Sequence, residues 1–175
     1  WGPDLVRAAL GGDLKPDGSL RVLHDGTHGV KVNNRAARVR DRHRTSTAAD
    51  QGHVLSRGRA SGRTVFQLKG DANRAHRRVK VRRKDWGFQA CRLRAHFTWL
   101  NMVGTFGIGS ISYFWARAIA GMARLVAYIM FNFDIFQALF ADDLLLTAWG
   151  AYAVENLVLA IFAYVVMGVP FSWSK

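Results

Sequence analysis

Two adjacent aspartates interrupt the most apolar half of this 175-residue chain, in the stretch LFADDLLLTAW over residues 139–149. Ionised carboxylates are rarely buried unless they are paired or hold a metal ion. The segments on either side, IFQALF and LLLTAW, each have the length and apolar character of a strand. The sequence therefore predicts a strand, a tight turn that carries Asp142 and Asp143, and a second strand.

The charge of the chain is divided unevenly. Residues 1–96 contain 22 Lys/Arg and 8 Asp/Glu, whereas residues 97–175 contain 3 and 4. A basic half joined to an apolar half is typical of a nucleic-acid-binding surface beside a catalytic core. It is also typical of a basic arm that leads into membrane helices, and residues 98–116 and 156–174 lack charges over nearly the ~20 residues that span a bilayer. The charges between these two stretches count against a small membrane protein with two transmembrane helices.

The remaining patterns predict a mixed fold. TVFQLKGD (64–71) is expected to be a buried strand that ends in Asp71, and residues 86–103 are expected to form a pair of strands. The other expected elements are a hairpin over 21–32 around Asp25-Gly26, a loop-rich stretch over 33–63, a Gly-rich loop over 104–110, and helices over 111–131 and 151–167. This order predicts an α+β fold in which an antiparallel sheet has helices on one face.

Asp71 is a candidate neighbour for the aspartate pair, because strands adjacent in a sheet would place all three carboxylates together. Like charges at such short range repel, and a divalent cation removes the conflict. Oxygen ligands of this kind suit Mg²⁺, and a site with two such ions performs phosphoryl transfer. An Asp-Asp pair considered alone is more typical of a solvated turn or a helix N-cap.

Four segments resemble, in order, the palm motifs of reverse transcriptases: LKGDANRAHRRVKV, MVGTFGIGSISYFW, ALFADDLLLTA and MGVPFSWSK. The neighbouring segments RVLHDGTHGVKVNN and DWGFQAC make the chain most similar to retroelement enzymes of the tyrosine-recombinase-linked, DIRS-like kind. The resemblance covers roughly residues 20–175. It implies a right-hand polymerase palm at 64–175, with an N-terminal segment and partial fingers at 1–63 and with thumb and downstream domains absent.

The activity implied by this resemblance is RNA-directed DNA polymerisation by two-metal nucleotidyl transfer to a primer 3′-hydroxyl. The implied partners are an RNA template, a DNA or RNA primer, dNTPs and the remaining parts of a longer polyprotein. A fragment of this size is expected to be weak or inactive by itself. A degenerate or non-catalytic nucleic-acid-binding segment is the third class of function compatible with the sequence.

The resemblance also assigns roles to individual residues. Asp71 and Asp142 would be the principal ligands of two Mg²⁺ ions, for which Mn²⁺ could substitute. Asp143 would be the partner acid, the Ala72 carbonyl a further ligand, and Lys175 the proton donor to the leaving pyrophosphate.

Residues implied to lie against the incoming nucleotide are Ala75, His76, Gly104, Phe106 and Gly107. His76 departs from the Tyr or Phe that the family usually has there. Those implied to contact the nucleic-acid backbone are Arg77, Arg78, Lys80, Arg82 and Arg83.

The sequence also excludes some classes. Its single cysteine, Cys91, excludes an internal disulfide framework and a zinc site built from cysteines. The first residues lack the basic segment followed by an apolar stretch that marks a secretory signal. An intracellular protein, nuclear or cytoplasmic, that is neither secreted nor inserted in a membrane is therefore expected.

Overall fold

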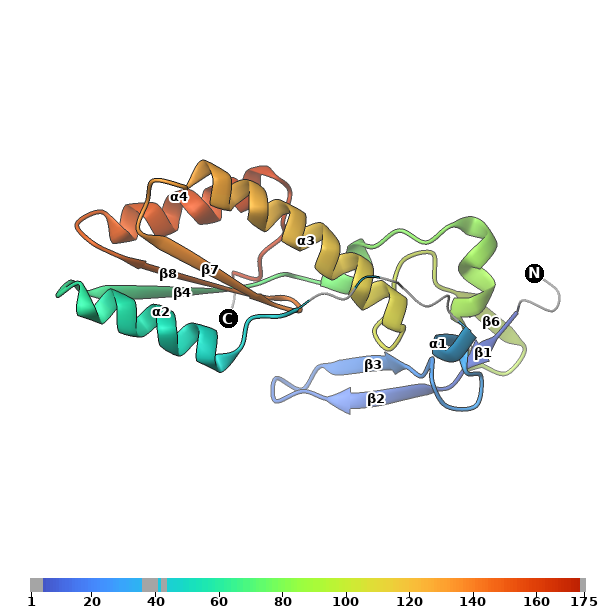
Figure 1. The fold of residues 1–175 in the computed structure, drawn as a ribbon. Helices are drawn as coiled ribbons and strands as arrows, with labels where there is room; N and C mark the ends of the chain where they lie inside the picture. Colours follow the sequence, from blue (N-terminus) through green and yellow to red (C-terminus); the bar gives the residue numbers. More distant parts are fainter. Residues whose placement is uncertain (1–4, 36–40, 42–43, 174–175) are drawn as a thin grey trace. The chain divides into compact units, whose positions relative to one another are not determined.

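The computed structural model describes residues 5–35, 41 and 44–173. The chain divides into two compact units. Unit 1 comprises Trp1–Arg42 and Arg74–Trp115, and unit 2 comprises His43–Asn73 and Ala116–Lys175. Both units contain helices and antiparallel strands, so the predicted α+β class is confirmed at that level (Figure 1).

Unit 2 is built on a three-stranded antiparallel sheet in the order β4-β8-β7, with bounds β4 Val65–Asp71, β7 Ile135–Phe140 and β8 Asp143–Trp149. The central strand β8 is almost continuously apolar, as expected for a strand that is covered on both faces. Leu146 and Ala148 of this strand are completely buried. A strand is present over the predicted range 64–71, but it lies at the edge of the sheet and is mostly exposed, so the prediction that it is buried is wrong. The predicted strand-turn-strand around the aspartates is confirmed, except that Asp143 is the first residue of β8.

Helices α3 (Gly109–Ile129) and α4 (Ala153–Val166) correspond to the two predicted helices. On one face of the sheet, Gly70 leaves room for Ile161 of α4 and for Phe171. The Tyr164 hydroxyl of α4 donates to Gln137 of β7 at 2.6 Å, and the Gln137 amide donates to the Ala123 carbonyl of α3. This chain of hydrogen bonds joins both helices to the sheet, and burial raises the pKa of Tyr164.

Helix α2 (Ala48–Ala60) corrects the prediction of a loop-rich stretch over 33–63. Thr47 accepts a hydrogen bond from the Asp50 amide, and the Asp50 carboxylate accepts one from the Thr47 amide, which is a capping box. The stretch has little apolar periodicity, so this box was the sequence signal for the helix.

Helix α2 also corrects the prediction that helices cover one face only. Its Gly58 lies against Val65 and Trp149, where an added Cβ would come within 2.7 Å of the Val65 side chain. Val65 and Gly70 are five residues apart in β4 and therefore face opposite sides of the sheet. Figure 1 shows α2 on the side of the sheet opposite α3 and α4.

Unit 1 contains short elements, with bounds β1 Arg7–Ala8, β2 Leu10–Leu14, β3 Leu20–His24, α1 Val32–Arg35, β5 Ala90–Arg94 and β6 Phe97–Leu100. Two 3₁₀ helices, Ala75–Arg78 and Arg83–Gln89, precede β5. β5 and β6 form the strand pair predicted over 86–103, although residues 86–89 belong to the second 3₁₀ helix instead of a strand. β1 pairs with β5 in parallel. One cluster of buried side chains in this unit consists of Val6, Val32, Ile108 and Ile111.

The hairpin predicted over 21–32 is wrong. β2 pairs with β3, and the turn is at Asp17-Gly18 instead of Asp25-Gly26. Both Asp-Gly pairs favour turns, but only Gly18 has a positive φ between paired strands, at +79°. Asp25 instead accepts hydrogen bonds from the amides of Thr27 and His28 and begins a loop.

The membrane alternative is not favoured. The uncharged stretch 98–116 contains the end of β6, a loop and only the first part of α3, so it is not a single helix. None of the helices that the structure describes has the length and hydropathy needed to cross a bilayer.

Candidate active site

The aspartate pair lies at the tip of the hairpin between β7 and β8. Phe140 pairs with Asp143, so Ala141 and Asp142 form a two-residue turn. Ala141 has φ +53°, at the first central position, where turns of type II′ have glycine. A non-glycine residue in this region is strained by roughly 1 kcal/mol or more. The turn places Asp142 beyond the end of the strand, where it is exposed, and Asp143 as the first residue of β8.

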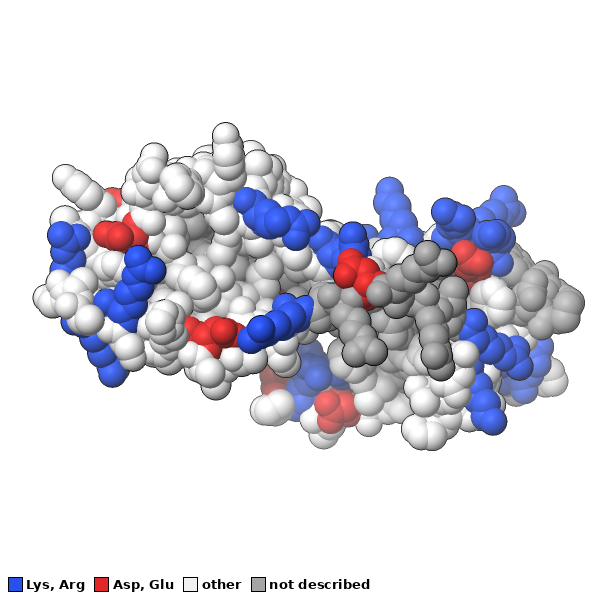
Figure 2. Space-filling model, in the orientation of Figure 1, with Lys and Arg blue, Asp and Glu red and all other residues white. Residues whose placement is uncertain are grey.

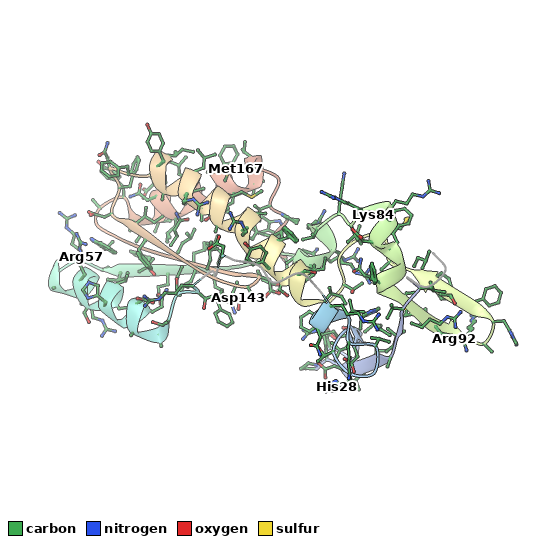
Figure 3. All side chains as sticks on the ribbon, turned by 45° about the vertical axis from the view of Figure 1, so that its right-hand side comes forward. His28, Arg57, Lys84, Arg92, Asp143 and Met167 are labelled. Atoms are coloured by element: carbon green, nitrogen blue, oxygen red, sulfur yellow. The ribbon has the colours of Figure 1, made fainter. Side chains whose placement is uncertain are left out.

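Asp71 lies directly opposite Asp143 in the β4-β8 register. Residues directly opposite in an antiparallel pair face the same side of the sheet, with Cβ atoms about 4.5–5.5 Å apart. The Ala72 amide donates to the Asp142 carbonyl at 2.8 Å, which extends the pairing one residue into the turn. The backbone thus brings Asp71, Ala72, Asp142 and Asp143 to one edge of the sheet, where Figure 3 labels Asp143.

The segment after α4 fixes the same corner. Ala72 forms an isolated antiparallel bridge with Phe171. The Ser172 amide donates to the Asp71 carbonyl at 2.8 Å, and the Asn73 amide donates to the Pro170 carbonyl at 2.7 Å. This contact was not foreseen from the sequence. Lys175, the predicted proton donor, lies outside the described residues.

Lys69 forms an ion pair with Asp143. Its Nζ lies 3.2 Å from Oδ1 of Asp143, with 66% of the Lys69 side chain and 41% of the Asp143 side chain exposed. At this exposure the pair contributes about 0–1 kcal/mol. Lys69 and Asp71 are two residues apart in β4, so their side chains lie on the same face of the sheet. Sequence reasoning missed Lys69, although the Lys-x-Asp spacing at the end of a strand contained the signal.

The donor chemistry of this edge suits a hard divalent cation, because carboxylate and carbonyl oxygens are the ligands that Mg²⁺ prefers. The aspartate side chains at this edge do not form a complete set of ligands for a metal ion. Among residues 5–35, 41 and 44–173, no group of three or more His, Cys, Asp or Glu side chains is positioned to hold a metal ion. Asp71 and Asp143 face each other, and Asp143 is paired with Lys69.

The Gly-rich loop over residues 104–110 lies in unit 1, and two of its glycines pack closely against backbone carbonyl groups. The Gly104 amide donates to the Val79 carbonyl at 2.8 Å, and a side chain on Gly104 would collide with the His76 carbonyl. Gly107 has φ +99°, and a Cβ there would collide with the His24 carbonyl. Only glycine fits at these two positions, which explains their residue type without reference to a ligand.

His76 contacts the same loop within unit 1. Its ring meets that of Phe106 edge to face, with centroids 5.2 Å apart, and its Nε2 lies 3.0 Å from the Ser112 hydroxyl. Ala75 beside it is buried. The structure thus brings together His76, Phe106 and Gly104, three of the five residues predicted to contact a nucleotide. The carboxylates belong to unit 2.

Two further residues of unit 1 hold the loop and were missed from the sequence. The Asn33 amide donates to the Gly107 carbonyl at 2.9 Å, and its Oδ1 accepts from the Gly109 amide at 2.8 Å. The His24 amide donates to the Phe106 carbonyl. His24 is 4% exposed, and neither ring nitrogen has a hydrogen-bond partner within the part of the chain that the structure describes. Burial lowers the pKa of this histidine. Contacts between positions more than 70 residues apart leave no local sequence signal.

The predicted backbone-binding residues Arg77, Arg78, Lys80, Arg82 and Arg83 are all exposed. Arg77 donates to the Asn101 side chain at 3.0 Å. Unit 1 contains 17 Lys/Arg against 6 Asp/Glu, whereas unit 2 contains 8 against 6. Basic side chains outnumber acidic ones on the face drawn in Figure 2.

Comparison with known proteins gives a structural match only. The sequence matches no protein-family model and no curated protein. Among solved structures, a foamy viral protease–reverse transcriptase in complex with double-stranded DNA matches with a TM-score of 0.64. The chain has a reverse transcriptase-like fold. Sequence identity is 11%, and the match covers 94% of this chain and 25% of the viral chain.

Proposed function

We propose that this chain is the fingers and palm portion of a retroelement reverse transcriptase, of the DIRS-like kind, and that it transfers nucleotides to a primer 3′-hydroxyl on an RNA template. The observation that carries the proposal is the β4-β8 register, in which Asp71 opposes Asp143 while Ala72 bonds to Asp142. The reverse transcriptase-like fold supports it independently of the sequence motifs.

In this proposal, Asp71 and Asp142 hold two Mg²⁺ ions together with Asp143 and the Ala72 carbonyl, and Mn²⁺ can replace Mg²⁺. When bound, such ions supply activation of the attacking hydroxyl and stabilisation of negative charge on the transferred phosphoryl group. The hydrogen bonds from Ala72 to Asp142 and from Ser172 to Asp71 fix the backbone of both principal ligands. Lys175 remains the predicted proton donor to pyrophosphate.

The residues of unit 1 have binding roles in the proposal. Ala75, His76, Gly104, Phe106 and Gly107 contact the incoming nucleotide. The exposed basic residues after Asp71 contact the phosphate backbone of primer and template, so binding should weaken steeply with salt as counterions are released. The solved relative is a complex with double-stranded DNA, which supports a nucleic-acid partner for this chain.

Metal binding is the first test. Titration with Mn²⁺, followed by electron paramagnetic resonance, should detect binding that Asp71→Ala and Asp142→Asn weaken about tenfold or more. Lys69→Met should strengthen binding, because it frees the Asp143 carboxylate from its ion pair. Asp13→Asn, an exposed acid of β2, is the matched control and should change nothing. Unaltered Mn²⁺ binding by Asp142→Asn would refute the assignment of these ligands.

Primer extension on an RNA template with Mg²⁺ tests the activity. The chain spans a quarter of its solved relative, so the chain alone should extend weakly or not at all. In a longer protein that contains this chain and extends primers, Asp142→Asn should reduce the rate about 1,000-fold, because a ligand of the catalytic ions is lost. Extension that persisted after this substitution would disprove the site, whereas strong extension by residues 1–175 would disprove only the expected weakness of the fragment.

A non-catalytic nucleic-acid-binding segment is the second candidate. It is favoured by one observation, that the described residues contain no group of three acidic or other metal-binding side chains already placed around an ion. Salt-sensitive primer–template binding that is unchanged by Mg²⁺, by Mn²⁺ and by Asp71→Ala would support this candidate over the polymerase.

A further inference from the structure

Helix α4 of unit 2 is apolar on almost its whole circumference. Of its 14 residues, AVENLVLAIFAYVV, only Glu155, Asn156 and Tyr164 are polar, and Asn156 and Tyr164 lie on its buried face. A helix that packs on a sheet with one face and meets water with the other normally carries polar residues on its outer face. A helix that lacks them is normally covered on both sides. The outer face of α4 is therefore a candidate interaction surface.

Apolar side chains on the outer face of α4 are 42–68% exposed, and there are six of them: Val154, Val158, Leu159, Phe162, Val165 and Val166. They recur at intervals of three and four residues, which places them on one side of the helix. Helix α3 covers the same face of the sheet and adds the exposed side chains of Leu125 and Tyr128. These eight residues are called the α3–α4 surface. The upper left of Figure 2, where Figure 1 draws both helices, is mostly white.

The α3–α4 surface is larger than the apolar patches that monomers usually expose. At the usual areas of aliphatic and aromatic side chains, its eight residues present roughly 600–800 Å² of apolar area. The largest apolar patch on a typical monomer measures about 300–600 Å². In a stable complex each partner contributes about 800 Å². The surface is therefore large enough to form most of one side of a protein–protein interface.

Charge indicates which molecule covers this surface. α4 contains no Lys or Arg, whereas helices that lie on a lipid surface are rich in both on their polar face. The exposed charges on the two helices include one of each sign, Glu155 on α4 and Arg124 on α3. When such a surface faces a copy of itself, apolar side chains meet apolar side chains, and the charges on the helices are not all of one sign. A second copy therefore covers the surface without the repulsion that like charges cause at an interface.

We propose that the α3–α4 surface pairs with the same surface of a second copy of this chain, so that α4 of one copy packs against α4 of the other. Two-fold pairing of one patch with itself is the commonest way in which identical chains associate. Phe162 is the largest side chain of the α4 set and is the expected anchor of the interface, since aromatic residues dominate binding energy. The pairing uses neither the aspartates nor unit 1, so it does not depend on the function proposed above.

Sedimentation velocity of the chain at concentrations from roughly 1 to 200 μM tests the proposal. The chain should convert from monomer to dimer with a dissociation constant of about 10 μM or lower, as expected for an apolar interface of this size. Added salt should not weaken the pairing, because salt screens interactions between charges and the interface contains few of them. The dimer should be the largest species, because two-fold pairing occupies the surface on both copies.

Phe162→Glu places a charge inside the interface on both copies and should weaken pairing at least about 100-fold. Phe162 is 60% exposed in the single chain, so the melting temperature of the monomer should change little. Phe97→Glu is the matched control, because Phe97 of β6 is 63% exposed and belongs to unit 1, and it should leave pairing unchanged. If Phe162→Glu fails to fold, Val158→Lys tests the same surface and should also weaken pairing.

Four results would overturn the proposal. The first two are a monomer at every concentration up to roughly 200 μM, and equal pairing by Phe162→Glu and Phe97→Glu. The third is binding of the monomer to phosphatidylcholine vesicles that Phe162→Glu abolishes, which would identify lipid as the partner. The fourth is a longer protein that contains this chain, stays monomeric and protects Phe162 from hydroxyl-radical oxidation, which would assign the surface to another part of that protein.

Discussion

Unit 1 and unit 2 differ in how charge and apolar surface are distributed. Unit 1 has 17 basic and 6 acidic residues, and its core cluster contains four buried side chains. Unit 2 has 8 and 6, and its buried residues run along β8, α3 and α4. A segment this rich in charged residues has fewer positions for apolar residues, so unit 1 has to be stabilised by other means.

Those other means are polar contacts to the backbone. In unit 1, Asn33 bonds to Gly107 and Gly109, and Asp25 accepts from the amides of His28 and Thr27, which lowers its pKa. In unit 2, the backbone groups of three neighbouring strands are paired in a regular hydrogen-bonded sheet, and helices cover this sheet. We infer from this contrast that the stability of unit 2 depends on the packing of buried side chains, whereas that of unit 1 depends on a few specific polar contacts. Four substitutions test this inference.

Leu146→Ala should have the largest effect and should act on unit 2. Leu146 is completely buried in the central strand, so its truncation should cost about 3–5 kcal/mol in the free energy of unfolding. Chemical denaturation combined with amide hydrogen exchange measures this cost and locates it. Leu14→Ala in unit 1, at a side chain that is 71% exposed, should cost less than about 0.5 kcal/mol. Similar losses for both leucines would contradict the contrast in packing.

Gly107→Ala should be the corresponding weak point of unit 1. Its positive φ and the collision of a Cβ with the His24 carbonyl should cost about 2–4 kcal/mol. Gly29→Ala is the control, since Gly29 also has a positive φ but has open space around it, and it should cost only about 1 kcal/mol. Equal costs would show that backbone conformation, and not the loop contact, limits this position.

Acidification should destabilise unit 1 through His24. Burial lowers the folded pKa of this histidine, Asp25 opposes the lowering and Arg77 adds to it. Because the unfolded state then binds the extra proton, stability should fall as the pH drops below about 6.5 and level off below the folded pKa. Each pKa unit between the unfolded and the folded state corresponds to a loss of about 1.4 kcal/mol in the free energy of unfolding over this pH range.

Hydrogen exchange of β3 and residues 104–108 between pH 5 and 8 measures this dependence. His24→Leu should remove it, whereas His53→Gln, at an exposed histidine of α2, should preserve it. A pH dependence that survives His24→Leu would assign the effect to another group.

Thr47→Ala should have the smallest effect of the four, about 1 kcal/mol. It removes the capping box at the start of α2 in unit 2. Exchange protection in the first turn of α2 should fall, while that of β4 and β8 changes little. Ser46→Ala, one residue before the cap, is the control. A larger loss than for Gly107→Ala would mean that unit 2 also depends on single polar contacts.

Elements with a strong local pattern could be predicted from the sequence. The helices near 111–131 and 151–167, the strand that ends in Asp71 and the strand-turn-strand around Asp142 follow from apolar runs and from charges that cannot be buried. Helix α2 was missed because its apolar face is short, and the turn of the first hairpin was misplaced because two Asp-Gly pairs compete. The site contacts of Asn33, His24 and Lys69 could not be predicted, because each depends on a distant or cross-strand partner.

The sequence alone determined that the chain turns at the aspartate pair, since ionised carboxylates are costly to bury among the apolar residues on either side. Only the tertiary structure decided that Asp71 faces Asp143, because the register between two strands 72 residues apart is set by which side chains the sheet buries.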